Sequence, residues 1–201
     1  MVDTLARLRE HIRSIEGRPA VDRGWMPSGL PALDACAGGL PRPGLIEVVG
    51  PVGGGRTRLA LALAAAATAQ HPLLWVDPQG TMFPPTAAAL GVRLDRLVVV
   101  RPPLEHLAWT VEQALRSGAF PLVVLDGPAE LPGAAARWGR TAQLGASTLC
   151  VVADQPGRDF VPAVRLVVMR GVATVQRHRS GRIGQSFPVP AWPQELDPWA
   201  R

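Results

Sequence analysis

Residues 48–67 read VVGPVGGGRTRLALALAAAA, and this stretch decides the fold. An apolar run enters a glycine-rich loop at Gly50 and leaves as an alanine-rich segment that predicts a helix. The loop has the spacing G-x-x-x-x-G-[K]-[ST] of a phosphate-binding loop, and the pattern is specific when a strand precedes it and a helix follows. Its glycines let backbone N–H groups converge on phosphate oxygens at the positive end of the helix dipole. The stretch therefore predicts the frame of a nucleotide site.

The loop departs from this pattern at Arg56, where lysine is expected. Lysine acts as a compact point charge between terminal phosphates, whereas a guanidinium is wide and planar with a fixed fork of donors. Two interpretations stay open: Arg56 binds phosphate in another geometry, or it swings out and the loop stays empty. Thr57 would supply a hydroxyl for Mg²⁺, and Asp126, at the carboxyl end of an apolar run, would hold the metal's water shell.

Outside the loop, short apolar runs alternate with segments of helix-compatible composition. The runs are LIEVV, LLWVD, LVVVR, LVVLD and TLCVVAD, and helices are expected at residues 56–70, 85–90, 104–117 and 133–145. Apolar strands interleaved with helices indicate a parallel sheet covered on both faces. After Pro162, the segments AVRLVVMRG, VATVQRHRSG and RIGQSFPV predict antiparallel strands that flank this sheet. The fold class is therefore α/β.

Composition narrows the class of protein. At 201 residues and 47% hydrophobic, the chain can bury one substantial core. No apolar run approaches the roughly 18 residues of a membrane span, and the charged first residues lack a signal peptide's apolar stretch, so we expect a cytoplasmic protein. Cys36 and Cys150 lack metal-ligand spacing, which predicts buried thiols and no metal site. All 21 basic residues are arginine and the net charge is +5, which is compatible with polyanionic or acidic partners but also with a biased genomic base composition.

The two ends of the chain differ from its middle. Residues 3–16 predict a short amphipathic helix with apolar residues at spacings of three, four and three. These residues are Leu5, Leu8, Ile12 and Ile15. Such a short helix needs another apolar surface, either on its own domain or on a partner. We expect a helix and linker at 1–24, a core domain at 25–188 and an extended tail rich in proline and tryptophan at 189–201.

Two arginine clusters suggest contact with nucleic acid. Arg177, Arg179 and Arg182 lie with His178 in QRHRSGR. Arg137 and Arg140 flank Trp138 in ARWGR, which combines charge with an aromatic ring for stacking. The alternative for the first cluster is a hairpin of solvated arginines, and the alternative for Trp138 is a place in the core.

The motifs together resemble a known family. PSGLPALDACAGGLPRPGLIEVVGPVGGGRTRL, LLWVDPQGTMFPPTAAALGVRLDRLVVVRP and EQALRSGAFPLVVLDG follow one another as in the ATPase core of the bacterial recombinase RecA, and the likeness covers nearly residues 25–188. Within that superfamily the chain most closely resembles the ImuA family of accessory proteins. These belong to the DNA-damage-inducible mutagenesis cassette, with an ImuB-type Y-family polymerase relative and a C-family polymerase. The resemblance implies RecA and the ImuB-type protein as partners, and a cytoplasmic, nucleoid-associated location.

The sequence differs from RecA at the positions of residues that bind ATP, hydrolyse it or contact DNA. Gln79 matches the glutamate that activates the attacking water, and a glutamine cannot accept that proton. Phe83 and Thr86 match the aspartate and tyrosine that contact adenine, while Gln155 matches the glutamine that senses the γ-phosphate. The segments that match RecA's two DNA-binding loops are short, and RecA's C-terminal domain has no counterpart in this sequence. Loss of a catalytic base alone commonly costs about 10²–10⁴-fold in rate, so we expect no meaningful ATP hydrolysis and no strand exchange.

Three functions are consistent with these residues. The leading one is a non-catalytic adaptor of translesion synthesis that docks on RecA through Leu5, Leu8, Ile12 and Ile15, restrains recombination and requires no cofactor. The second is a DNA-binding protein that uses the arginine clusters. The third is a residual ATP-binding switch or weak ATPase, in which Mg-ATP binds at a phosphate site that is otherwise vestigial. That site comprises Gly50, Gly53, Gly54, Gly55, Arg56, Thr57, Asp126 and Gln155.

Overall fold

An eight-stranded sheet forms the centre of the computed structural model, which describes residues 24–128, 133–179 and 183–191. The strands lie in the order β10-β9-β8-β3-β7-β6-β4-β5. Their bounds are β3 (Gly44–Val49), β4 (Leu73–Val76), β5 (Leu97–Val100), β6 (Leu122–Asp126), β7 (Thr148–Ala153), β8 (Val164–Met169), β9 (Val172–His178) and β10 (Ser186–Pro188). Strands β8 to β5 pair in parallel, while β9 and β10 pair antiparallel at one edge. The expected α/β fold is therefore confirmed.

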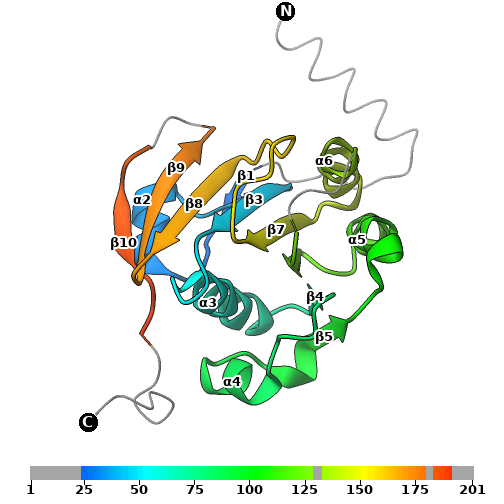
Figure 1. Cartoon of the computed structure of the whole chain (residues 1–201), viewed down its shortest axis with the longest axis horizontal. Coiled ribbons are helices and arrows are strands. Elements are labelled where there is room, and N and C mark those ends of the chain that lie inside the picture. The colour runs from blue at the N-terminus through cyan, green and yellow to red at the C-terminus, as the bar shows by residue number, and fades with distance from the viewer. Residues whose placement is uncertain (1–23, 129–132, 180–182, 192–201) are drawn as a thin grey trace, which may run out of the picture.

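The helices cover both faces of this sheet (Figure 1). Their bounds are α2 (Pro31–Ala37), α3 (Arg56–Thr68), α4 (Pro84–Ala89), α5 (Leu104–Ser117) and α6 (Ala134–Gly145), with a 3₁₀ turn, η1, at Leu94–Arg96. Four of them agree with the expected helices to within two residues at either end. Helix α2 and a separate two-stranded sheet of β1 (Gly24–Met26) and β2 (Leu40–Arg42) are additional to the prediction.

Alternation along each strand divides the core in two. In β3, Ile46 and Val48 join the cluster under α2 and α3, whereas Leu45 and Val49 join the cluster under α5 and α6. Adjacent strand residues point to opposite faces, so one apolar run supplies both layers. Trp75 of β4 is fully buried on the α3 side. The near-continuous apolar runs of the sequence are thus explained by a sheet that is covered on both sides.

The candidate site lies at the carboxyl ends of the parallel strands. Strand β3 lies between β7 and β8, and its glycine-rich loop leads directly into α3. In open parallel sheets, ligands bind in the crevice beyond these ends, where neighbouring strands connect in opposite directions. No helix among the described residues is long and apolar enough to cross a membrane.

Several expected features lie outside the described residues. They are the N-terminal helix at 3–16 with its four apolar residues, Arg182, and residues 192–201 of the tail. Part of the segment after β6, residues 129–132, is also outside.

Candidate functional site

The glycine-rich loop between β3 and α3 is held by backbone contacts to β7 and to the β8–β9 turn. The Gly50 amide donates to the Ala153 carbonyl at 3.2 Å, and the Gly171 amide donates to the Gly54 carbonyl at 3.1 Å. A Cβ atom added at Gly50 would lie 2.1 Å from the Val168 carbonyl oxygen of β8. Glycine is therefore required at position 50 by the close approach of two backbones, whether or not phosphate binds.

The middle of the loop has the left-handed backbone that the motif needs. Gly53 has a φ of 78° and Gly55 a φ of 106°, a region that favours glycine. A hollow of about 210 Å³ lies over this part of the loop, lined by residues that include Val52, Gly53 and Thr57. The Val52 side chain is 87% exposed. The frame of a phosphate-binding loop is thus present.

Arg56 folds back over the loop. Its Nη1 donates to the carbonyl oxygen of Gly50, the first residue of the motif. Its Nε is buried and has no hydrogen-bond partner. Because the guanidinium bonds to the loop itself, it is not swung out into solvent.

Two carboxylates end neighbouring strands on the α3 side of the sheet. Asp126 ends β6 and is 9% exposed, and Asp77, directly after β4, is fully buried. Burial and, after it, the charge of Asp77 raise the pKa of Asp126 to about 6, while the charge of Arg56 opposes both. The carboxyl of Asp126 is therefore still mostly ionised at neutral pH.

Asp77 has a structural role that the sequence analysis missed. Its carboxylate accepts hydrogen bonds from the backbone amides of Thr81 and Met82 at 2.9 and 3.1 Å. Arg101 approaches it at 3.3 Å from Nε to Oδ2. An aspartate directly after an apolar strand, followed within five residues by a turn at Gly80, was the available signal.

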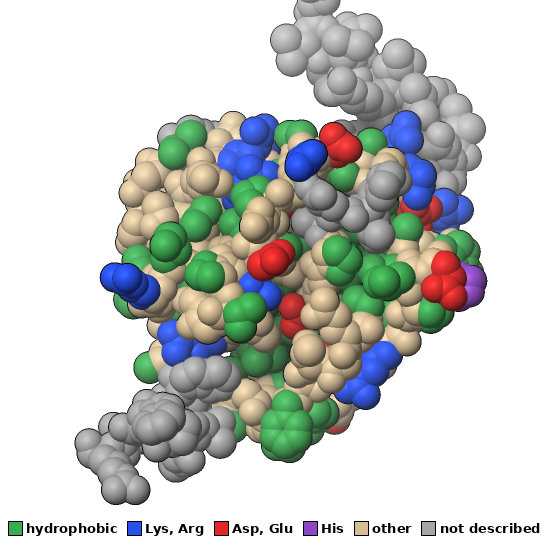
Figure 2. All heavy atoms as spheres, in the orientation of Figure 1, with side chains coloured by type: hydrophobic (Ala, Val, Ile, Leu, Met, Phe, Trp, Pro, Cys, Tyr) green, Lys and Arg blue, Asp and Glu red, His purple; other side chains and the backbone are tan. Residues whose placement is uncertain are grey.

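The two glutamines flank this site and are exposed. Gln79 lies in the turn after β4, which the Gly80 amide closes by donating to the Asp77 carbonyl at 3.2 Å. Gln155 lies two residues beyond the end of β7. The structure therefore brings the loop, Asp126, Gln79 and Gln155 to one end of the sheet. On the face shown in Figure 2, acidic side chains lie both near the centre and at the right-hand edge, while arginines lie mostly toward the edges.

The connection from β7 to β8, residues 154–163, is anchored to the central strand. Glu47 of β3 is fully buried, forms an ion pair with Arg165 of β8 and accepts a hydrogen bond from the Gly157 amide at 2.8 Å. Arg165 also donates to the Phe160 carbonyl at 3.1 Å, and Phe160 is 2% exposed. The connection is therefore tied to the core at Gly157 and Phe160, at the place where the resemblance implies a DNA-binding loop.

The first arginine pair does not offer a stacking surface. Trp138 is fully buried in the core under α5 and α6, with its Nε1 3.4 Å from the Ala108 carbonyl oxygen. The interpretation of Trp138 as a stacking ring is therefore wrong, because its helix turns that face inward. Arg137 pairs with Glu112 at 2.7 Å, and Arg140 is exposed.

The second arginine cluster surrounds a different aromatic ring. His178 is 6% exposed and stacks on Trp25 of β1, with ring centroids 4.6 Å apart. Arg179 covers the same ring at 5.0 Å from its centroid. Arg177 is exposed at the end of β9 and donates from Nε to the Pro162 carbonyl at 2.9 Å. His178 is thus a core residue, while Arg177 and Arg179 reach the surface.

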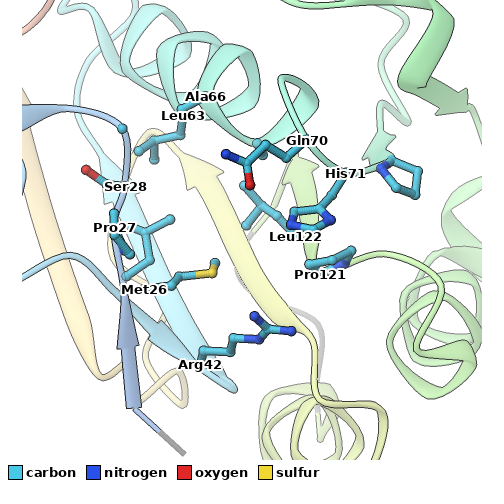
Figure 3. Close-up of a pocket in the computed structure, with 14 residues that line it drawn as sticks. Met26, Pro27, Ser28, Arg42, Leu63, Ala66, Gln70, His71, Pro121 and Leu122 are labelled. Carbon is cyan, nitrogen blue, oxygen red and sulfur yellow. The ribbon is translucent and has the colours of Figure 1, made fainter. Parts of the chain in front are cut away.

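A second hollow lies toward the opposite end of α3 (Figure 3). It measures about 310 Å³ and lies between the β1–β2 sheet, the end of α3 and the start of β6. Its lining mixes apolar residues such as Met26, Leu63 and Leu122 with Arg42 and Gln70. No sequence motif marked this hollow. No cluster of three or more metal-ligating side chains occurs in the described part of the chain.

The residues fit Mg-nucleotide only in part. The glycine amides and the Thr57 hydroxyl are of the right kind, but the guanidinium of Arg56 bonds to the Gly50 carbonyl and no lysine is present. Asp126, mostly ionised at neutral pH, is also of the right kind for the metal's water shell. The mismatch is therefore at Arg56, whose guanidinium bonds to the loop where a phosphate-binding lysine is expected.

Comparison with known proteins places this frame in a family. The model for the RecA N-terminal domain matches residues 10–147. Protein RecA of Salinispora tropica and of Salinispora arenicola are each 40% identical over 118 residues, which are 57% of this chain and 34% of theirs. Protein RecA of Streptomyces ambofaciens is 40% identical over 110 residues, 53% of this chain and 30% of its own. The chain spans about a third of the length of these relatives. Since the family model covers more than half of it, the chain belongs to the RecA family through the N-terminal domain.

Proposed function

We propose that the chain is a non-catalytic RecA-like adaptor in SOS-induced translesion DNA synthesis. It binds RecA, an ImuB-type polymerase relative, or both, and it restrains recombination by RecA at the nucleoid. The observation that carries the proposal is the nucleotide site itself. Arg56 bonds to the loop's own Gly50 carbonyl, and exposed Gln79 stands where the resemblance implies a water-activating carboxylate.

A subunit of this kind would bind its partner without hydrolysing ATP. The connection at 154–163 is pinned to Glu47 and Arg165, so it is not free to extend along a DNA strand. What remains for a RecA-type protomer is its joining surface. We assign that surface to the N-terminal apolar residues, each contributing about 1–3 kcal/mol when buried. The residues concerned are Leu5, Leu8, Ile12 and Ile15.

Co-purification tests this assignment directly. The full chain is mixed with RecA and with the ImuB-type protein, each with and without ATP and single-stranded DNA. We expect capture of RecA by the full chain and at least a tenfold loss of capture in a Leu8→Asp, Ile12→Asp variant, which loses two buried anchors. The control is Leu94→Asp, at a side chain that is 44% exposed on η1. Equal capture by all variants would contradict the assigned interface.

Direct DNA binding is the second candidate, and the exposed arginines at the end of β9 favour it. Arg177 and Arg179 both reach the surface, and Arg179 is held over the Trp25 ring. If they contact phosphates, binding to single-stranded DNA weakens steeply with salt and the Arg177→Ala, Arg179→Ala variant has a shallower salt dependence. Unchanged binding in that variant would remove this candidate.

A further inference from the structure

The glycine-rich loop is closed by contacts within the chain. The Gly54 amide donates to the Pro51 carbonyl at 3.0 Å, and the Gly54 carbonyl accepts from Gly171. Arg56 spans the loop from the first turn of α3 to Gly50. In a working phosphate-binding loop, phosphate oxygens gather such a loop around themselves. Here the Gly54 amide and the Gly50 and Gly54 carbonyls have partners within the chain.

Charge at this end of α3 is balanced by the sheet. The first turn of α3 contains Arg56 and no acidic residue, although the positive end of the helix dipole favours an anion there. Asp126, at the end of β6, lies close enough to Arg56 for their charges to interact. Asp77, directly after β4, has a cation of its own, because Arg101 approaches it at 3.3 Å from Nε to Oδ2. Arg56 is thus a cation beside Asp126, in the region where a metal ion and a lysine would otherwise supply the positive charge.

We propose that Arg56 is an internal cation that replaces the metal and the phosphate-binding lysine, so that the loop is folded without ligand and does not take up Mg-nucleotide. The guanidinium closes the loop on the Gly50 carbonyl, and its charge acts on the neighbouring Asp126 carboxyl. The structural state of this chain is then independent of ATP. This inference goes beyond the adaptor function and does not depend on which partner is bound.

Thermal unfolding of the full chain with Mg-ATP tests the proposal. For the wild type we expect no rise in Tm up to millimolar Mg-ATP. In Arg56→Lys the ligand-free Tm falls, and Mg-ATP then raises it by about 5–10 °C at roughly 100-fold saturation. A lysine ammonium is a compact point charge without the planar fork, so it can turn from the Gly50 carbonyl toward a terminal phosphate.

Arg96→Lys is the matched control. Arg96 bonds to the Thr68 carbonyl at 3.3 Å and to the Ala69 carbonyl at the far end of the same helix. We expect Arg96→Lys to lower the Tm with no response to Mg-ATP. A wild-type Tm that rises with Mg-ATP would overturn the proposal, as would an Arg56→Lys variant that folds and gains no response.

Hydrogen exchange on the wild type keeps the proposal testable if Arg56→Lys does not fold. Without ligand, the Gly54 and Gly171 amides should be protected, because their partners belong to the chain, and Mg-ATP should leave that protection unchanged. Fast exchange at both amides that slows on addition of Mg-ATP would overturn it. Both measurements use the isolated chain, so their failure is distinguishable from a failure to capture RecA.

Discussion

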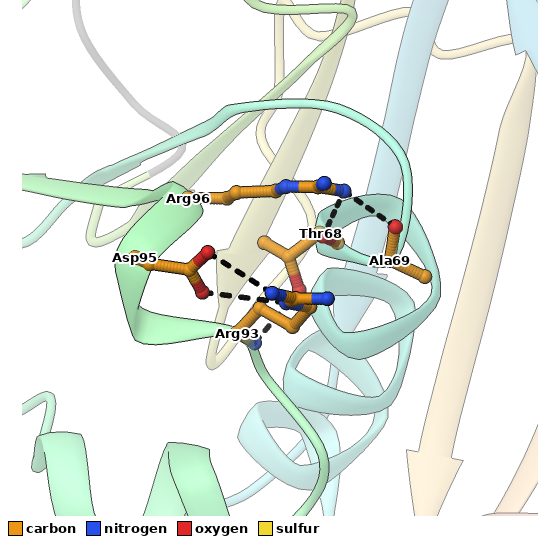
Figure 4. A network of polar contacts seen from close by, with 5 residues as sticks. All are labelled: Thr68, Ala69, Arg93, Asp95 and Arg96. Atoms are coloured by element: carbon orange, nitrogen blue, oxygen red, sulfur yellow. Dashed lines mark hydrogen bonds and ion pairs between the residues drawn. The ribbon is translucent and has the colours of Figure 1, made fainter.

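The two ends of helix α3 each have an arginine bonded to backbone carbonyls, but their electrostatics are opposite. At the C-terminal end, Arg96 of η1 donates to the carbonyls of Thr68 and Ala69 (Figure 4). A cation there complements the negative end of the helix dipole. At the N-terminal end, Arg56 is a cation at the positive end of the dipole. The first arrangement complements the helix dipole, whereas the second places a cation against it.

Hydrogen bonds of an uncharged side chain, Thr68, also distinguish the C-terminal end of α3 from its N-terminal end. Thr68 is fully buried, and its hydroxyl donates to the Ala64 carbonyl at 2.7 Å and accepts from the Arg93 amide at 3.1 Å. The C-terminal end is therefore tied to η1 through hydrogen bonds that complete its last turn. The N-terminal end is held by the sheet, through the packing of Gly50 against β8 and the hydrogen bond from the Gly171 amide to the Gly54 carbonyl. The loop end of α3 is therefore joined to the sheet, whereas its other end is joined to η1.

We expect the largest loss of unfolding free energy at the ion pair that joins β8 to β3. Glu47→Ala leaves Arg165, only 18% exposed, without its buried partner and should cost about 3–5 kcal/mol of unfolding free energy. Urea unfolding followed by circular dichroism measures it. The control Glu112→Ala breaks a pair whose Arg137 side chain is 48% exposed and should cost less than about 1 kcal/mol. Equal losses at both sites would contradict a loop end that depends on β8.

Gly50→Ala should have the next largest effect. Its Cβ would lie 2.1 Å from the Val168 carbonyl oxygen, so we expect a loss of about 3 kcal/mol as β3 and β8 separate. Gly53→Ala has open space around the new Cβ and suffers only from its positive φ, which costs about 1–2 kcal/mol. The comparison is made by chemical denaturation at matched conditions. A larger loss at Gly53 than at Gly50 would show that backbone conformation, and not contact with β8, decides the loop.

Replacing the buried carboxyl of Asp126 should raise the unfolding free energy by an amount that depends on pH. Because the folded pKa of Asp126 is raised from 3.8 to about 6, its charge destabilises the fold as pH rises through that range. Asp126→Asn should therefore match the wild type below about pH 4 and be more stable above pH 6, by at most about 3 kcal/mol. Unfolding free energies from pH 4 to 8 measure this gain. Asp95→Asn, at an exposed carboxyl whose pKa is lowered by a hydrogen bond from Arg93, should show no such gain. A variant that loses stability at pH 7 would contradict the account.

We expect the smallest loss of unfolding free energy at the C-terminal end of α3. Arg96→Met removes hydrogen bonds to Thr68 and Ala69 at a partly exposed position and should cost about 1 kcal/mol. Amide exchange of residues 68–71 should accelerate while exchange at the glycine-rich loop is unchanged. Faster exchange at the loop as well would show that the two ends are coupled.

Regular elements were predictable because their signals are local. The apolar runs and the loop spacing predicted the parallel strands and four of the helices, and the turn residues after Pro162 predicted the antiparallel edge. The strands of the β1–β2 sheet are three residues long and include Pro41, so no periodic signal marks them. The α/β class depended on none of these short elements.

The contacts that define the site were not predictable, because they join residues far apart in the chain. Glu47 meets Arg165 across 118 residues, and Trp25 reaches His178 from β1. The motif identified Arg56 as a departure, but only the folded loop shows its bond to Gly50. Trp138 was placed between two arginines by sequence, whereas the inward face of α6 buries it.

Steady-state ATP hydrolysis by the full chain tests most directly the claim that the RecA-type frame is retained without its chemistry. With Mg-ATP, in the presence and absence of single-stranded DNA, we predict turnover indistinguishable from that of buffer, and no change in Gln79→Ala. Turnover at the rate of a RecA control that requires Mg²⁺ and disappears in Gln79→Ala would contradict the account.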